Sequence, residues 1–341
     1  MPLLPEHSAP QHERAPRPLP LFLELLREVA ERDPALASEA LAGLLAYEQA
    51  PRRERPEPKP EIARVRGAAL RDHGGSGPPA VLVPSLINPP RILDLDEQVS
   101  LTAAIARMGR RSILLDWGKA DERRELSVSG HVEELLLPLL RSIGERAALI
   151  GYCLGGTMAI AAANLTSVER VATIAAPWHF ANYPQASRNA LEEMWRHSEA
   201  AAKQLGALPM EVLQASFWSL DPERTVRKFA EFGRLEPASA DARRFVELED
   251  WANEGEPLPY SAAKELMEDL FGRDLPGSGK WLGSDVLDIP VLHLTAEHDR
   301  IAPDSTAPAG ERAAIPSGHV GMIVGSARVR LHAALAAFLS D

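Results

Sequence analysis

The sequence of 341 residues contains one cysteine, Cys153, so the chain cannot form an internal disulfide and suits a reducing compartment. Cationic residues are also in the minority: 37 Lys and Arg against 48 Asp and Glu give a formal net charge of −11, which disfavours nucleic-acid binding. No apolar run is long enough to span a bilayer, and the first residues lack the basic region of a secretory signal. We therefore expect a cytoplasmic protein with no transmembrane segment and no nucleic-acid partner.

Changes in composition divide the chain into predicted regions. With 45% hydrophobic residues, the chain is long and apolar enough to bury one large core. Residues 1–60 read as an N-terminal helical segment and a proline-rich linker. Residues 61–177 and 282–341 contain short apolar strands alternating with helices, which predicts an α/β core with a mostly parallel central sheet and helices on both faces. Residues 178–281 are helical and charge-rich, and we interpret them as a helical cap inserted into this core.

Finer elements can be predicted within the first part of the chain. Helical spacing over residues 21–31 and 35–47 predicts a helical hairpin, and 51–60 is its linker to the core. Residues 62–70 and 80–86 are expected to be strands. The glycine-rich stretch 74–77 between them lacks the lysine and the following helix of a phosphate-binding loop, so we interpret it as a hairpin turn.

The single cysteine lies at the centre of a Gly-Tyr-Cys-Leu-Gly-Gly turn, residues 151–156. An apolar strand-like run precedes this turn and an alanine-rich helical run follows it. This arrangement is typical of a nucleophile elbow, in which a strained backbone exposes the central side chain and its neighbours must be small. The following helix would favour the thiolate of Cys153 and offer the backbone N–H of Leu154 to an oxyanion. The alternative is a buried cysteine that packs as a small hydrophobe.

A thiol nucleophile needs a base, and the base needs an acid to orient it. In α/β-hydrolases these groups follow one another along the chain in the order nucleophile, acid, histidine. Asp299 is the candidate acid because it follows a buried strand predicted over residues 289–295. His319 is the candidate base because it lies in a glycine-flanked loop that precedes a final amphipathic helix over residues 329–339.

Nearby residues compete for both roles. Glu297 and Asp304 are alternative acids, and most loop aspartates are only turn or cap residues. His298 is next to the candidate acid rather than after it, and His293 lies within the predicted strand and should point into the core. A metal site is disfavoured, because no pair of histidines or carboxylates has a recognised ligand spacing around the cysteine.

Five short motifs occur in order between residue 80 and the C-terminus. They are Val-Leu-Val-Pro-Ser-Leu-Ile-Asn with a following Leu-Asp-Leu (81–95), Leu-Leu-Asp-Trp-Gly (114–118), Gly-Tyr-Cys-Leu-Gly-Gly-Thr (151–157), His-Asp-Arg-Ile-Ala-Pro (298–303) and Ser-Gly-His-Val-Gly-Met-Ile-Val (317–324). Together they resemble the polyhydroxyalkanoate (poly-3-hydroxybutyrate) synthase family. The Asp-Trp-Gly element is most similar to the shorter class that works with a second subunit. The resemblance implies an α/β-hydrolase fold and an acyltransferase.

The resemblance also implies a role for each matching residue. Cys153 would be the nucleophile that accepts the acyl group, His319 the general base and Asp299 the residue that orients it. The oxyanion hole would combine the backbone N–H groups of Leu154 and Ile87. The substrates would be a 3-hydroxyacyl-CoA and a growing polyester chain, with coenzyme A entering only as the thioester and with no metal or cofactor. A homodimer, a second synthase subunit and a location at the polyester granule surface are compatible with this family.

Two departures from the family pattern leave other functions open. Asp304 stands where an aromatic residue often follows the proline after the acid, and residues 127–131 stand where the family often has Asp-Asp-Tyr. One alternative is a thioesterase, esterase or polyester depolymerase that uses the same triad with water as the acyl acceptor. A second alternative is a non-catalytic paralogue that binds granules or regulates an active subunit, although a binding protein has no need for all three triad side chains.

Overall fold

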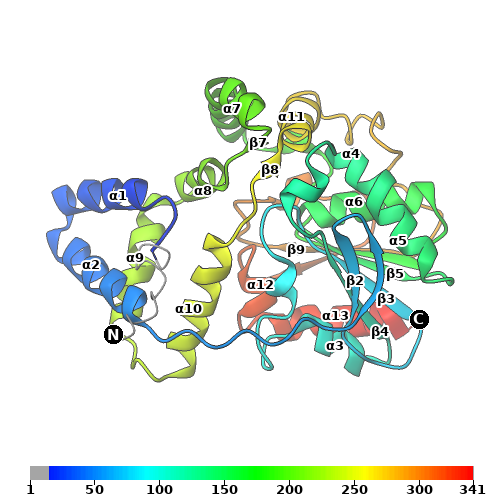
Figure 1. The fold of residues 1–341 in the computed structure, drawn as a ribbon, viewed down its shortest axis with the longest axis horizontal. Coiled ribbons are helices and arrows are strands. Elements are labelled where there is room, and N and C mark those ends of the chain that lie inside the picture. Colours follow the sequence, from blue (N-terminus) through cyan, green and yellow to red (C-terminus); the bar gives the residue numbers. More distant parts are fainter. Residues whose placement is uncertain (1–14, 341) are drawn as a thin grey trace, which may run out of the picture. The chain divides into compact units, whose positions relative to one another are not determined.

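The computed structural model describes residues 15–340, which form two compact units. The helical unit contains residues 15–56 and Glu211–Glu254, and the sheet unit contains Glu57–Met210 and residues 255–340 (Figure 1). Residues 1–14, the start of the predicted N-terminal segment, lie outside the described residues. The units do not follow the predicted regions, because part of the segment interpreted as a cap packs with the N-terminal helices instead.

The sheet unit is built on eight strands in the order β1-β2-β4-β3-β5-β6-β9-β10. Neighbouring strands from β4 to β10 are parallel, whereas β1 with β2 and β2 with β4 are antiparallel. The strands are β1 Glu61–Val65, β2 Ala68–Asp72, β3 Pro79–Val83, β4 Arg111–Asp116, β5 Ala148–Tyr152, β6 Arg170–Ile174, β9 Val291–Ala296 and β10 Arg312–Ile315. Every residue of β3, β5 and β6 is buried, as expected for parallel strands covered on both faces.

Helices cover both faces of this sheet, with α3 and α13 on one face and α5 and α6 on the other (Figure 1). The helices are α3 Leu101–Arg107, α4 Val128–Gly130, α5 Leu137–Ser142, α6 Leu154–Leu165, α12 Gly321–Val324 and α13 Arg328–Ser340, with a π-helical turn, His131–Leu136, between α4 and α5. The first nine residues of α6 are all buried, which is why its sequence is apolar on every side. The predicted mostly parallel sheet with helices on both faces is confirmed.

The sheet unit also carries helices from the segment interpreted as a cap. They are α7 Gln185–Leu205, α11 Tyr260–Lys264 and the π-helical Glu265–Gly272, and a small sheet pairs β7 Ala207–Leu208 with β8 Leu258–Pro259. Across residues 15–340, none of the helices combines the length and the hydropathy that a membrane span requires.

The prediction of a single strand over residues 62–70 was wrong. The chain reverses at Arg66 and Gly67, where Arg66 has a φ of 51°, so the segment forms the antiparallel pair β1 and β2. Residues 74–77 are not a hairpin turn either, because β2 and β3 do not pair with each other and β4 lies between them. The placement of β4 between β2 and β3 depends on residues 111–116, so the glycines at 74–77 alone could not predict it. The strand predicted over 80–86 ends at Val83, which leaves the following residues in a loop.

The helical unit contains α1 Leu19–Arg32, α2 Pro34–Gln49, α8 Met210–Ser219, α9 Pro222–Gly233 and α10 Ala240–Asn253. The predicted helices over 21–31 and 35–47 are confirmed as α1 and α2. Asp33 begins α2 by accepting the Leu36 N–H at 3.0 Å. The core of the unit is aromatic: the ring of Phe229 meets those of Phe22, Tyr47 and Phe245 edge to face, with centroids 4.8 to 5.7 Å apart.

Close packing of α2 on α9 depends on Gly43. A Cβ built on Gly43 would lie 1.8 Å from the backbone oxygen of Phe229. We therefore expect Gly43→Ala to lower the free energy of unfolding by about 1–3 kcal/mol through overpacking, although alanine favours a helix over glycine by about 1 kcal/mol. Urea unfolding followed by circular dichroism measures this change. Ala46→Ser, at an exposed position of α2, is the control and should cost no more than about 0.5 kcal/mol. Equal stability of Gly43→Ala and the wild type would contradict the contact.

Candidate active site

Cys153 lies between β5 and α6 in a strained backbone conformation, with φ of 56° and ψ of −131°. Its N–H donates to the carbonyl of Ile174 in the neighbouring strand β6 at 2.9 Å, and its own carbonyl accepts the Gly156 N–H at 2.8 Å. The side chain is half-buried and carries a free thiol at the N-terminus of α6. The sharp strand-turn-helix geometry expected of a nucleophile elbow is present.

The glycines around Cys153 are required by backbone contacts. A Cβ on Gly155 would lie 2.0 Å from the carbonyl oxygen of Val83, and one on Gly151 would lie 2.3 Å from the Cα of Gly156. These contacts are far closer than real side chains tolerate, so residues 151–156 accept no larger side chain at either position. The same contacts bring the start of α6 against the end of β3.

Asp299 and His319 meet although 20 residues separate them. Nδ1 of His319 lies 2.8 Å from Oδ2 of Asp299, and both side chains are buried. The other carboxylate oxygen of Asp299 accepts the N–H groups of Ile301 and Ala302, each at 2.8 Å. Asp299 follows β9 and His319 follows β10, and because these parallel strands end at the same edge of the sheet, their loops converge.

The competing residues do not join this pair. Glu297 and Asp304 are exposed, and so is His298. His293 is buried within β9, as expected, where its ring nitrogens lie 2.8 Å from the Thr173 hydroxyl and 3.0 Å from the carbonyl of Ala309. The carboxylate and imidazole that meet are therefore those of Asp299 and His319, the two residues chosen as candidates from the sequence.

His319 also interacts with the elbow. Its ring stacks at a tilt on that of Tyr152, with centroids 5.2 Å apart, and the Tyr152 hydroxyl donates to the His319 carbonyl at 3.4 Å. Burial disfavours the charged imidazole, but the negative charges of Cys153 and Asp299, together with a hydrogen bond to each, outweigh burial and raise the pKa of His319 to about 10. A protonated His319 is therefore favoured beside Cys153 and Asp299.

The two backbone donors expected for an oxyanion are at the elbow and in the loop after β3. Leu154 is the first residue of α6, where backbone N–H groups lack helical acceptors. The N–H of Ile87 lies 3.4 Å from the hydroxyl oxygen of Ser85, a long contact. Their joint action on an oxyanion stays a prediction.

Two side chains that hold the loop after β3 were not expected from the sequence. The indole N–H of Trp117 donates to the carbonyl of Pro84 at 3.0 Å, and Nη2 of Arg123 lies 3.5 Å from the carbonyl oxygen of Leu86. Trp117 belongs to the Asp-Trp-Gly motif, but nothing in that motif assigns it a partner. Arg123 lies in a charged stretch, residues 119–125, that reads as solvent-exposed.

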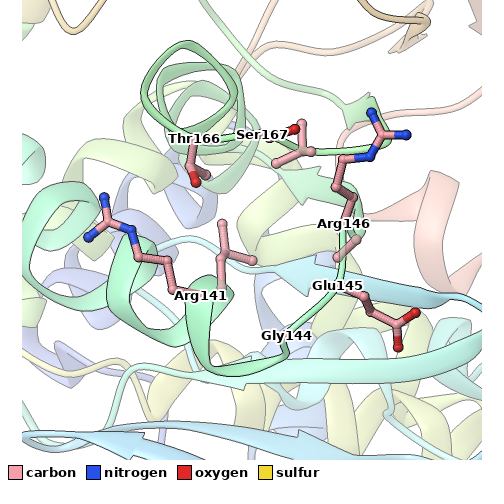
Figure 2. A pocket seen from close by; sticks show the side chains of 9 residues that line it. Arg141, Gly144, Glu145, Arg146, Thr166 and Ser167 are labelled. Atoms are coloured by element: carbon pink, nitrogen blue, oxygen red, sulfur yellow. The ribbon is translucent and has the colours of Figure 1, made fainter.

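Two further polar features lie outside this group. A cavity of about 270 Å³ opens between the end of α5 and the start of β5, with Arg141, Arg146, Thr166 and Ser167 on its rim (Figure 2). It lies where β5 and β6 begin, at the opposite end of the strands from Cys153. Among residues 15–340, no group of three or more His, Cys, Asp or Glu side chains is arranged to hold a metal ion.

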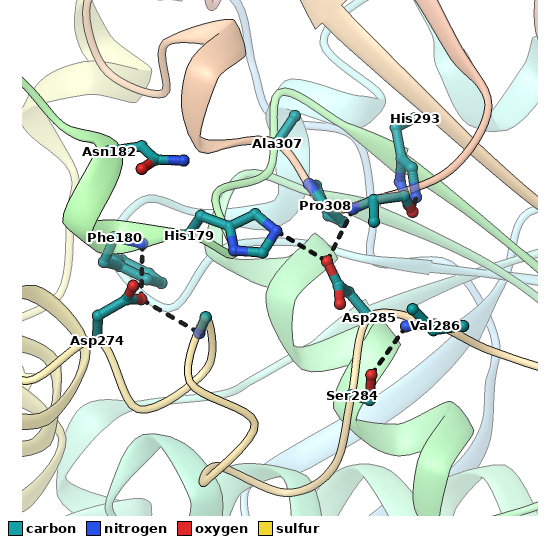
Figure 3. A network of polar contacts seen from close by, with 12 residues as sticks. His179, Phe180, Asn182, Asp274, Ser284, Asp285, Val286, His293, Ala307 and Pro308 are labelled. Atoms are coloured by element: carbon teal, nitrogen blue, oxygen red, sulfur yellow. Dashed lines mark hydrogen bonds and ion pairs between the residues drawn. The ribbon is translucent and has the colours of Figure 1, made fainter.

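A polar network ties the chain after β6 to the irregular segment before β9 (Figure 3). Nε2 of His179 lies 2.9 Å from Oδ2 of Asp285, which also accepts the Ala309 N–H at 2.8 Å. One residue further on, the Phe180 N–H donates to Oδ1 of Asp274 at 2.8 Å. His179 thus links the residues after β6 to the irregular segment before β9.

Comparison with curated proteins finds poly(3-hydroxyalkanoate) polymerase subunits named PhaC. The chain is 27% identical to the Haloarcula marismortui subunit over 293 residues, which are 77% of this chain and 61% of that subunit. It is 26% identical to the Synechocystis sp. subunit over 77% of this chain and 78% of that one. For the Allochromatium vinosum subunit the identity is 24% over 85% of this chain and 84% of that one. The resemblance to the polyhydroxyalkanoate synthases is confirmed over most of the chain.

The chain matches different shares of its relatives' length. The chain spans about three fifths of the length of the Haloarcula and Haloferax relatives. No family model matches the chain. Among solved structures, a meta-cleavage product hydrolase (CumD) superposes with a TM-score of 0.50 at 17% identity, over 83% of this chain and 98% of that one. This likeness supports the α/β-hydrolase fold.

The two negative neighbours of His319 can be removed one at a time. Cys153→Ala and Asp299→Asn should each lower the pKa of His319, as measured by NMR titration of the labelled imidazole. Because this pKa is above its ordinary value of 6.5, protonation stabilises the folded chain. That contribution is complete below pH 6.5 and is lost as the pH rises through about 10, so both variants should flatten the fall in unfolding free energy over this range. Glu297→Gln, an exposed carboxylate in the same loop, is the control. An unchanged pKa in Asp299→Asn would refute the electrostatic cause.

Proposed function

We propose that this chain is an acyltransferase of the polyhydroxyalkanoate synthase type, which moves 3-hydroxyacyl groups from coenzyme A thioesters through Cys153 to a growing polyester. The observation that carries the proposal is the strained, glycine-framed cysteine with His319 hydrogen-bonded to Asp299 at 2.8 Å beside it. The PhaC relatives support the same reaction class, since their name describes a polymerase subunit.

The first half-reaction loads the enzyme. The thiolate sulfur of Cys153 attacks the thioester carbonyl, and the carbonyl electrons move to an oxyanion that the N–H groups of Leu154 and Ile87 would stabilise. The oxyanion collapses, the bond to the coenzyme A sulfur breaks, and the His319 imidazolium gives its proton to the leaving thiolate. A thiol suits this step because the product is again a thioester, so the acyl group stays activated.

The second half-reaction extends the polymer. The hydroxyl of another hydroxyacyl group attacks the thioester on Cys153, and the now neutral His319 removes its proton. An ester bond forms, the bond to the Cys153 sulfur breaks, and the thiolate–imidazolium pair is restored. Asp299 keeps Nδ1 of His319 protonated throughout, so Nε2 is the nitrogen that exchanges the proton.

Transfer to a hydroxyl rather than to water requires a covered site. Tyr183, near the start of the segment interpreted as a cap, donates to the carbonyl of Ile301 at 2.9 Å, beside Asp299. Its ring packs against those of Phe180 and Phe271. Burial, with the charges of Cys153 and Asp299, raises the pKa of Tyr183. We propose that this aromatic cluster, held beside Asp299 by the bond to Ile301, excludes water from the site.

The test is turnover of 3-hydroxybutyryl-CoA by the purified wild type, Cys153→Ala and His319→Gln. Free coenzyme A is followed with a thiol reagent, and acyl products are identified by mass spectrometry. We expect coenzyme A release with oligomeric products from the wild type, and a loss of at least about 10³-fold in both variants. Ser167→Ala, beside the cavity at the far end of the strands, should match the wild type.

The products separate this proposal from its alternatives. Cysteine-dependent release that yields only free 3-hydroxybutyrate would move the assignment to a thioesterase. Release that survives in Cys153→Ala would remove the thiol from the mechanism. No release from the wild type, alone or with an added synthase partner subunit, would favour the non-catalytic paralogue.

A further inference from the structure

A buried guanidinium lies behind the loop that follows β3. Arg123 is only 2% exposed, and in the described part of the chain its Nε has no hydrogen-bond partner. Nη1 lies 3.1 Å from Nε2 of His131, and Nη2 lies 3.5 Å from the carbonyl oxygen of Leu86. Glu256 and Asp116 attract it electrostatically, which partly offsets the cost of burial. Burying a cation whose contacts are an imidazole and a backbone carbonyl is costly, so the arrangement calls for a function.

The imidazole of His131 is neutral and serves as an acceptor. It is fully buried, and its Nδ1 lies 2.6 Å from the carbonyl oxygen of Ser127, so Nδ1 carries the proton and Nε2 presents its lone pair to Arg123. Burial and the Arg123 charge lower the pKa of His131 to about 3. The ring of Trp117 meets that of His131 edge to face at 5.6 Å. These contacts fix the direction of the guanidinium.

Three carbonyls of the loop face three different donors. Pro84 accepts from the Trp117 indole at 3.0 Å and Ile87 from the N–H of Glu256 at 3.2 Å, whereas Nη2 of Arg123 approaches the Leu86 carbonyl oxygen to 3.5 Å. The carboxylate of Glu256 in turn accepts the Ala120 N–H at 3.2 Å, which ties Glu256 to the segment between Trp117 and Arg123. The contact between Gly155 and the backbone at Val83 and Pro84 presses the loop against the start of α6.

The planar peptide bond between Leu86 and Ile87 links the Leu86 carbonyl to the Ile87 N–H, the predicted oxyanion donor. In a trans peptide the C=O and the next N–H point in opposite directions within one plane. The Arg123 guanidinium, 3.5 Å from the Leu86 carbonyl oxygen, therefore lies on the opposite side of this peptide from the Ile87 N–H. The cation also polarises the peptide group and strengthens the N–H as a donor. The 3.4 Å contact of that N–H with Ser85 is weak enough to be exchanged for a substrate oxygen.

We infer that Arg123 is a positioning residue, which acts through the Leu86 carbonyl to aim and strengthen the Ile87 N–H of the oxyanion hole, with neutral His131 as its fixed support. The inference rests on the proposed function of Cys153 as an acyl-accepting nucleophile. It assigns a role to a residue that neither the motifs nor the triad required.

Two reactions at Cys153 test this inference. Acylation by p-nitrophenyl acetate passes through a tetrahedral oxyanion, whereas alkylation by iodoacetamide does not, so only acylation needs the hole. The variants are Arg123→Met, which keeps the aliphatic volume without the charge, and Arg123→Lys, which keeps the charge. Arg110→Met is the matched control: Arg110 is 6% exposed and pairs with Glu169 at 2.6 Å, away from the loop.

We expect Arg123→Met to slow acylation about 10- to 100-fold, somewhat less than loss of a direct oxyanion donor, with the alkylation rate unchanged. Arg123→Lys should recover part of the acylation rate. Arg110→Met should alter neither rate, although both methionine variants should lower the melting temperature. Melting curves and circular dichroism establish that each variant is folded.

Several results would overturn the inference. An equal fall in both reactions would make Arg123 a purely structural residue, and an unchanged acylation rate in Arg123→Met would remove it from the site. A wild type whose Cys153 is alkylated but not acylated would have no oxyanion hole to position. If the wild type is acylated by p-nitrophenyl acetate but does not turn over 3-hydroxybutyryl-CoA, the proposed function fails, and the comparison of the two rates still decides the role of Arg123.

Discussion

The contact between the start of α6 and the end of β3 is the constraint on which the candidate site depends. Gly155 has no side chain, so its backbone approaches Val83 and Pro84 directly. This approach joins the elbow to the loop that carries Ile87, and it leaves Cys153 in its strained conformation at the helix N-terminus. Asp299 and His319 reach the same edge because β9 and β10 are parallel to β5. A wider spacing between α6 and β3 would separate the two backbone donors.

Two buried imidazoles near this edge have opposite charge preferences, and their neighbours explain the difference. His319 has negatively charged groups on both sides, so its pKa rises despite burial. His131 faces the guanidinium of Arg123, so burial and charge act together and its pKa falls. The first ring can store and return a proton, whereas the second can only accept a hydrogen bond. Burial alone therefore does not determine the role of a histidine; the sign of the adjacent charge does.

The sequence predicted those parts of the molecule that local patterns encode. The elbow needs glycines at fixed positions, and the sequence shows them. The loops that carry Asp299 and His319 each follow an apolar run that predicts a strand. These two residues could therefore be selected from the sequence, and the structure places them 2.8 Å apart. The split of residues 62–70 into β1 and β2 was missed, because Arg66 is an unusual residue for a left-handed turn position. The roles of Trp117 and Arg123 depend on backbone carbonyls about 35 residues earlier in the chain, and side-chain patterns carry no information about such partners.

The composition of the helical unit has a consequence for biosynthesis. Its aromatic core joins Phe22 and Tyr47 of the first two helices to Phe229 and Phe245. About 170 residues of chain separate α2 from α9, so at 5–20 residues per second the ribosome needs roughly 10–35 s to supply the partner helices. During that interval the apolar faces of α1 and α2 have only each other to pack against. The nascent chain would therefore present them to chaperones until α9 and α10 emerge, which is still before β9 and β10 are made and the sheet is complete.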